Sequence, residues 1–135
     1  SSKQVELARR LAPKATFREG DMTNFDFAPE FFDGVVSWYA MIHVPREKHG
    51  NILRNVHRVL RPSGVALVCM GAGDNPYERA ATFMGLPVPM GWSHFDSGSN
   101  LSMIRESGFH ILQSEVVPDR PPHEGAHLYV LARAE

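Results

Sequence analysis

The sequence predicts an α/β fold whose parallel sheet ends in an antiparallel hairpin. Residues 33–38 and 65–70 are continuous apolar runs of strand length, which is typical of strands covered on both faces. The helical pattern over 45–60 between them is long enough to reverse the chain, as a parallel pair of strands requires. Residues 109–117 and 126–133 alternate like strands and are separated by a short loop, which predicts the hairpin.

Composition indicates one soluble globular domain and disfavours several classes of protein. The chain has 135 residues, 43% of them hydrophobic, and a formal net charge of −1, whereas disordered chains are poorer in apolar residues and less balanced in charge. Basic residues form no cluster beyond pairs such as Arg9-Arg10, and no apolar run approaches the roughly 20 residues that cross a bilayer. We therefore expect no binding to nucleic acid or membrane, and a cytoplasmic location. The single cysteine, Cys69, excludes a disulfide framework.

The first elements are predicted to be a helix and then a strand. Apolar residues recur at helical spacing over 2–12 until a proline blocks continuation, and Ser1 with Gln4 fits a capping box. Residues 15–19 are rich in β-formers and run into Gly20-Asp21, a pair suited to a sharp turn. We interpret this segment as a strand that ends in a loop.

A wide apolar stripe predicts the central helix. The stripe ends at Leu60, and Pro45 stands where the helix can begin. Arg61–Gly64 has the composition of a turn, and it leads into the second apolar strand.

The region over 71–99 is poorly patterned, with only Tyr77–Met84 showing weak helical character. So long an insert in a compact domain usually carries function. After it, Asn100 is predicted to cap a short helix that stops at Gly108.

The order of these elements, together with several short motifs, resembles the class I S-adenosylmethionine-dependent methyltransferases of the small type 11 kind. The motifs are Phe17-Arg18-Glu19-Gly20-Asp21-Met22, Phe32-Asp33-Gly34-Val35-Val36-Ser37, Arg61-Pro62-Ser63-Gly64 and the closing strand from His127 to Arg133. The resemblance implies a Rossmann-like three-layer sandwich with a mainly parallel sheet. It also implies S-adenosyl-L-methionine as cofactor and methyl transfer to a small-molecule acceptor.

The resemblance places cofactor contacts at the ends of two strands. Gly20, Asp21 and Met22 match the position where the family holds adenine, and a carboxylate suits that role because it can only accept a hydrogen bond from the amino group. Ser37, Trp38 and Tyr39 match the stretch that passes the methionine portion, where an aromatic face attracts a sulfonium. Asp21 has a plainer interpretation as the cap of a turn, and Trp38 as ordinary core.

The insert is expected to face the acceptor through Trp92, His94 and Asp96. Methyl transfer is an in-line displacement, for which the enzyme mainly positions the two reactants. A base is needed only when the acceptor must lose a proton, and His43 or His94 could supply one. The sequence leaves open whether either histidine acts in this way, and it does not distinguish oxygen, nitrogen or carbon methylation.

Two family features are missing from the sequence: the glycine-rich loop after the first strand and the acid that grips the ribose hydroxyls. We therefore expect a domain truncated at its N-terminus, whose unpaired strand edges favour a homodimer or a strand-swapped assembly. The alternative function is a non-catalytic binding or dimerisation module. A nicotinamide-dependent reductase is disfavoured because its closing strands would be parallel. His123 and His127 lie in or near a Pro-rich loop, so we expect no metal site.

Overall fold

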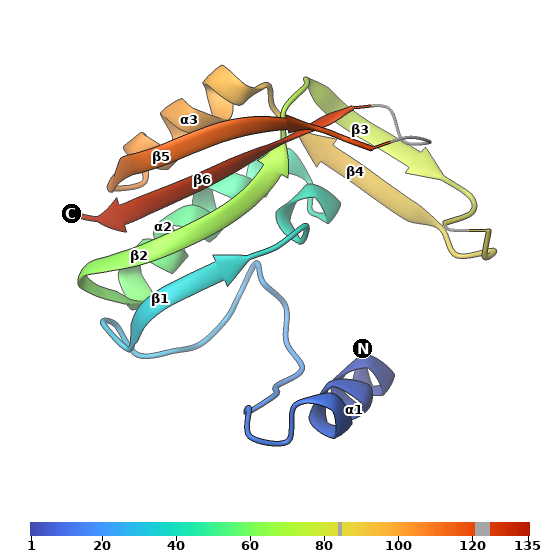
Figure 1. Ribbon diagram of the computed structural model, residues 1–135, viewed down its shortest axis with the longest axis horizontal. Coiled ribbons are helices and arrows are strands. Elements are labelled where there is room, and N and C mark those ends of the chain that lie inside the picture. The colour runs from blue at the N-terminus through green and yellow to red at the C-terminus, as the bar shows by residue number, and fades with distance from the viewer. Residues whose placement is uncertain (84, 121–124) are drawn as a thin grey trace.

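The computed structural model describes residues 1–83, 85–120 and 125–135, and Figure 1 shows their arrangement. The helices are α1 (Ser2–Leu11), α2 (His49–Val59) and α3 (Ser97–Glu106), with 3₁₀ turns η1 (Met41–His43) and η2 (Arg46–Lys48). The strands are β1 (Phe32–Ser37), β2 (Leu60–Gly71), β3 (Asn75–Ala80), β4 (Met90–His94), β5 (Phe109–Pro118) and β6 (Ala126–Ala134).

Four strands form the main sheet in the order β1-β2-β6-β5. The pair β1 and β2 is parallel and is joined through α2, as the two apolar runs predicted. The pairs β2 with β6 and β5 with β6 are antiparallel, so the terminal hairpin is confirmed. The described part of the sheet is therefore mixed, with its parallel portion at the β1 side.

The core lies between this sheet and the two helices behind it, α2 and α3 (Figure 1). The stripe predicted for the central helix is the buried face of α2, where Leu53 is 1% exposed. It packs on alternate residues of β2 and β6, whose successive side chains point to opposite faces. The buried cluster consists of Met41, Ile52, Leu53, Val56, Leu60, Ala66, Val68, Met70, Ile104, Phe109, Leu128, Val130, Ala132 and Ala134.

The opposite face of the sheet carries exposed apolar side chains, among them Val36 and Val65. In Figure 1 α1 lies apart from the sheet, and it buries none of its side chains. Ser1 makes no side-chain capping bond there, so the predicted capping box does not form. None of the helices in the described ranges is long and apolar enough to cross a membrane.

The strand predicted over residues 15–19 is wrong: the structure gives this segment as irregular chain. A strand needs a neighbour for its N–H and C=O groups, and β1 is the edge of the described sheet. Without a strand beside it, β propensity alone does not produce the element.

The weak helix predicted from Tyr77 is also wrong where the structure describes it. Asn75–Ala80 is β3, which pairs with β4 in an antiparallel hairpin. Met84 lies outside the described residues. The insert is thus an ordered projection beside the main sheet rather than a loop with a helical turn (Figure 1).

Two local predictions need correction. The α3 helix begins at Ser97 with Asp96 as its N-cap, while Asn100 is buried within the helix. The segment predicted as a turn, Arg61–Gly64, belongs to β2 and forms a bulge, because Leu60 pairs with Phe32 and Val65 with Gly34. A Cβ at Gly64 would lie 2.9 Å from the Arg61 carbonyl oxygen, so the bulge requires glycine.

Candidate active site

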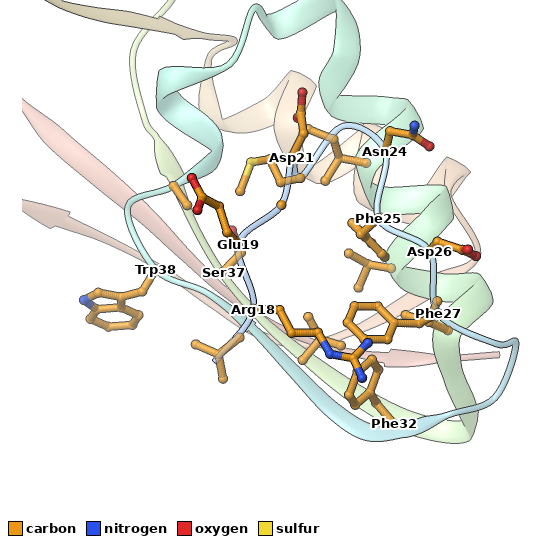
Figure 2. A pocket seen from close by; sticks show the side chains of 18 of the residues that line it. Arg18, Glu19, Asp21, Asn24, Phe25, Asp26, Phe27, Phe32, Ser37 and Trp38 are labelled. Atoms are coloured by element: carbon orange, nitrogen blue, oxygen red, sulfur yellow. The ribbon is translucent and has the colours of Figure 1, made fainter. Parts of the chain in front are cut away.

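A cavity of about 850 Å³ opens along the free edge of β1 and beyond its carboxyl end. Its walls are β1, α2 and the segment 18–27, which curves around the opening in Figure 2. The volume is within the range of small-molecule sites. The structure brings five predicted cofactor residues to its lining: Gly20, Asp21, Met22, Ser37 and Trp38.

Asp21 closes a turn, which is the plainer of the two interpretations considered for it. Its Oδ1 atom accepts hydrogen bonds from the backbone N–H and the hydroxyl of Thr23, both at 2.8 Å, and this closes the turn. These bonds lower the pKa of the Asp21 carboxyl below its usual value of 3.8, so the side chain stays ionised near neutral pH. Oδ2 accepts no hydrogen bond from the described residues, and Asp21 is one of the residues that line the cavity.

Further cavity residues were missed from the sequence. Arg18, Asn24, Phe25 and Phe27 line the cavity on either side of Asp21. The Arg18 guanidinium carbon lies 5.5 Å from the centroid of the Phe27 ring, which supports a cation–π contact. Their closeness to Asp21 in the sequence could have identified these residues as neighbours of the site. Hydrophobic periodicity gives no such information, because the segment is irregular and exposed.

Of the residues at the end of β1 and in the loop after it, Ser37 lies at the cavity and Tyr39 lies against β6. Ser37 lines the cavity, and its Oγ atom is buried without a hydrogen-bond partner among the described residues. Tyr39 does not line the cavity, because its hydroxyl is hydrogen-bonded to that of Tyr129 and its ring packs edge-on against His127. The bond to Tyr39 and burial raise the pKa of the Tyr129 phenol. Tyr39 has a φ of 49°, a left-handed conformation that is strained for a side chain of this size.

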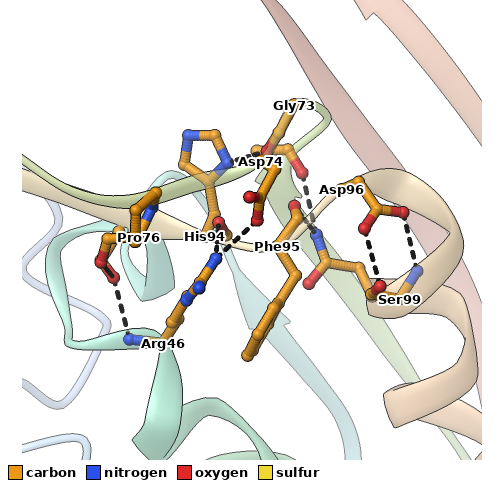
Figure 3. Close-up of polar contacts among 11 residues, drawn as sticks. Arg46, Gly73, Asp74, Pro76, His94, Phe95, Asp96 and Ser99 are labelled. Atoms are coloured by element: carbon orange, nitrogen blue, oxygen red, sulfur yellow. Dashed lines mark hydrogen bonds and ion pairs between the residues drawn. The ribbon is translucent and has the colours of Figure 1, made fainter.

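The hairpin of β3 and β4 is tied to η2 by Arg46 (Figure 3). The Arg46 guanidinium donates to Asp74 Oδ1 at 2.5 Å and lies 4.5 Å above the centroid of the Phe95 ring. Its backbone N–H donates to the Ser93 hydroxyl at 3.0 Å, and that hydroxyl donates to the Pro76 carbonyl at 2.6 Å. One residue thereby contacts both ends of the insert.

Two of the predicted acceptor-side residues pack within this insert. The Trp92 ring centroid is 5.9 Å from that of His43. His94 donates through Nδ1 to the Gly73 carbonyl at 2.5 Å, and its half-buried ring lies directly over Gly71. Neither His43 nor His94 lines the cavity, so the structure places them on the neighbouring surface.

Asp96 serves as a helix cap. Its Oδ1 accepts the Ser99 backbone N–H at 3.0 Å and its Oδ2 accepts the Ser99 hydroxyl at 2.7 Å. Ser99 thereby lowers the pKa of the Asp96 carboxyl. Because both oxygens are engaged, contact between Asp96 and an acceptor stays a prediction to which the structure adds no support.

Of the two histidines near the Pro-rich loop, the structure describes one. His127 donates to Asp119 Oδ1 at 2.7 Å, whereas His123 lies outside the described residues. Within the described ranges no three His, Cys, Asp or Glu side chains are grouped so that they could hold a metal ion.

Open α/β sheets bind ligands in the crevice beyond the carboxyl ends of their strands, and the cavity occupies that position. Comparison with known proteins indicates which class of protein shares this fold. A family model described as "Methyltransferase domain" matches residues 1–64. A sterol 24-C-methyltransferase from Aspergillus fumigatus is 29% identical over 131 residues, which cover 87% of this chain and 34% of that protein. An uncharacterized methyltransferase from Oceanobacillus iheyensis is 31% identical over 78 residues, covering 58% of this chain and 35% of that protein.

Solved structures show the same fold. An S-adenosylmethionine-dependent methyltransferase from Methanosarcina mazei superposes with a TM-score of 0.84 at 17% identity, covering 99% of this chain and 78% of that one. A Burkholderia thailandensis 1,6-didemethyltoxoflavin-N1-methyltransferase with bound substrate and S-adenosylhomocysteine gives a TM-score of 0.70 at 23% identity, covering 98% and 56%. The fold is therefore the Rossmann-like α/β fold of S-adenosylmethionine-dependent methyltransferases, and the methyltransferase family model matches just under half of the chain. The chain spans about a third of the length of the curated relatives it matches.

Proposed function

We propose that the protein transfers a methyl group from S-adenosyl-L-methionine to a small-molecule acceptor. The observation that carries this proposal is the cavity in which Gly20, Asp21 and Met22 meet Ser37 and Trp38. When bound, the cofactor supplies a methyl group made electrophilic by its sulfonium. The chain's residues supply binding and orientation, which account for most of what an in-line displacement needs.

The side chains present fit the adenosyl part of the cofactor. Asp21 offers a free carboxylate oxygen to an amino group, and Met22 and Phe25 offer a soft apolar wall to a ring. The buried Ser37 hydroxyl without a partner among the described residues is available to the polar end of a ligand. The glycine-rich loop and the ribose-binding acid of the family have no counterpart in this sequence.

On the acceptor side, Trp92 and His94 of β4 form a candidate wall with His43 of η1. The apolar tip of the insert, where Leu86 and Val88 are exposed, favours an acceptor with apolar surface. A sterol 24-C-methyltransferase and a 1,6-didemethyltoxoflavin-N1-methyltransferase are among the similar proteins, and their names support a small-molecule acceptor. A base is required only for an acceptor that must lose a proton, and His43 and His94 are the candidates.

Chemical-shift mapping tests where the cofactor product binds. Titrating ¹⁵N-labelled protein with S-adenosylhomocysteine is expected to shift amides in 18–27 and 37–40, two loop segments that contribute residues to the cavity lining. The measurement should use this chain and the chain with any native residues that precede Ser1. Shifts confined to α3 or β5 in either form would contradict the assigned cavity.

A further inference from the structure

Hydrogen bonding at His43 determines which ring nitrogen carries the proton. His43 Nδ1 lies 2.9 Å from the Gly91 carbonyl oxygen of β4. A carbonyl only accepts, so Nδ1 must be the donor in this contact. Neutral imidazole has one N–H group, and the lone pair is therefore on Nε2. The ring is exposed, and among the described residues no protein atom is hydrogen-bonded to Nε2.

Two other imidazoles near the insert, His49 and His94, are unsuited to proton exchange with a ligand. His49 is 0% exposed, and its Nε2 donates to the Val44 carbonyl at 3.0 Å. His94 is packed over Gly71, where an added Cβ would lie 2.2 Å from ring atoms. Of these three imidazoles, His43 is the one that combines an exposed ring with a fixed tautomer.

The surroundings of His43 indicate the class of molecule that would meet it. The Trp92 ring lies beside the imidazole, and the Phe83 centroid is 6.0 Å from that of Trp92. Trp92 is thus within contact range of the rings of both His43 and Phe83. Such a cluster of rings suits a flat apolar molecule, because aromatic rings pack well on one another in offset or edge-on arrangements.

We propose that the Gly91 carbonyl holds His43 as the Nδ1–H tautomer, so that Nε2 accepts the proton of an aromatic hydroxyl on the acceptor. This inference rests on the proposed function. The acceptor's O–H bond breaks, its electron pair stays on oxygen, and the proton forms a bond to Nε2. The resulting imidazolium then releases its proton to water. The β3–β4 hairpin is thereby a positioning element for the proton acceptor as well as a wall of the acceptor site.

Two substitutions separate this role from a purely structural one. His43→Asn keeps a side-chain N–H near the Nδ1 position, where it can still donate to Gly91, but it has no basic nitrogen. His43→Gln places its amide near Nε2 and gives up the Gly91 bond. If His43 only anchors the hairpin, His43→Asn will behave as the unsubstituted protein and His43→Gln will not.

Phenol and thiophenol are matched probes, because the thiol is largely ionised near neutral pH and needs no base. With S-adenosyl-L-methionine present, we expect His43→Asn to lower methylation of phenol by about 10²-fold more than methylation of thiophenol, because the thiophenol loss reports only the altered contact with the acceptor. An equal effect on the two probes would overturn the inference. Methylation of neither probe by unsubstituted protein that binds S-adenosylhomocysteine would overturn the assigned acceptor class.

Nuclear magnetic resonance gives a readout that needs no activity. A long-range ¹H–¹⁵N spectrum at a pH where His43 is neutral is expected to show a protonated Nδ1 and an unprotonated Nε2. The opposite tautomer would overturn the inference. Titration with S-adenosylhomocysteine does not involve His43, so failure of that titration in the unsubstituted protein would count against the proposed function itself.

Discussion

Asn100 is a buried amide that joins three segments of the chain. Its Nδ2 donates to the Gly71 carbonyl at 2.9 Å and to the Phe95 carbonyl at 2.8 Å, so α3 is tied to the end of β2 and the end of the hairpin. The sequence suggested a cap because Asn favours helix starts. Asp96 satisfies that preference better, and Asn100 is used for its donors instead.

Replacing Asn100 by Asp is expected to destabilise the fold by about 2–4 kcal/mol at neutral pH. A carboxylate donates no hydrogen bond and would place negative charge beside two carbonyl oxygens in a buried site. The free energy of unfolding from urea titration provides the measurement. A change below about 0.5 kcal/mol would mean that these two bonds contribute little.

Burial of His49 links stability to pH. Burial lowers the pKa of His49 below its ordinary value of 6.5. The folded state therefore resists protonation while the unfolded state binds a proton below about pH 6.5. The contribution is complete above that pH and is lost as the pH falls, so the free energy of unfolding should decrease from about pH 7.5 to about pH 5.5.

His49→Gln provides the matched control for this effect. Its amide can still donate to the Val44 carbonyl but does not titrate. We expect a shallower pH dependence of urea denaturation in this variant. An unchanged slope would assign the pH dependence to other groups.

At the scale of elements, hydrophobic periodicity predicted the helices and strands that bury an apolar face. It did not predict the segments whose structure depends on a hydrogen-bonding partner strand. The apolar stripe of α2 and the run at β2 were predictable because each buries a face. Residues 15–19 show the opposite case, since a strand requires a neighbour that the described sheet does not provide. The hairpin strand β3 escaped prediction because Pro76 and charged residues interrupt its pattern.

Arg46 is expected to keep the hairpin in place. Arg46→Ala removes the contacts with Asp74 and Phe95 but keeps the backbone bond to Ser93. Hydrogen exchange in β3 and β4 should become faster, while exchange in β2 and β6 stays unchanged. Arg46→Lys, which keeps the charge but not the planar stacking, should lie between the two. Equal exchange in all three proteins would show that Arg46 does not hold the insert.

The whole molecule depends on one core behind the main sheet. Leu53→Ala is expected to lower the free energy of unfolding by about 2–5 kcal/mol, because its side chain is 1% exposed at the centre of that core. Leu11→Ala in α1, where the side chain is 77% exposed, should change it by less than about 0.5 kcal/mol. Similar effects at the two positions would contradict a single core that excludes α1.

The parts of the candidate site that could be predicted from the sequence are those where a residue of suitable chemistry follows a predicted strand. The other lining residues could not be predicted in this way. Asp21, Met22 and Ser37, which the resemblance assigns to the cofactor, line the cavity, and their contact with the cofactor stays a prediction. Tyr39 turns toward Tyr129 because of a backbone conformation that the sequence does not reveal. Arg18 reaches the cavity through an irregular segment, whose course is set by tertiary contacts rather than by local pattern.

Calorimetry with S-adenosylhomocysteine tests the central claim most directly, using this chain and the chain with any native residues that precede Ser1. Asp21→Asn keeps an oxygen for the Thr23 turn but replaces the second acceptor by a donor. We predict that the longer form binds and that Asp21→Asn weakens binding by about tenfold or more, whereas Thr23→Val has a smaller effect. No binding by either form, or equal affinity of Asp21→Asn and the unsubstituted protein, would contradict the account.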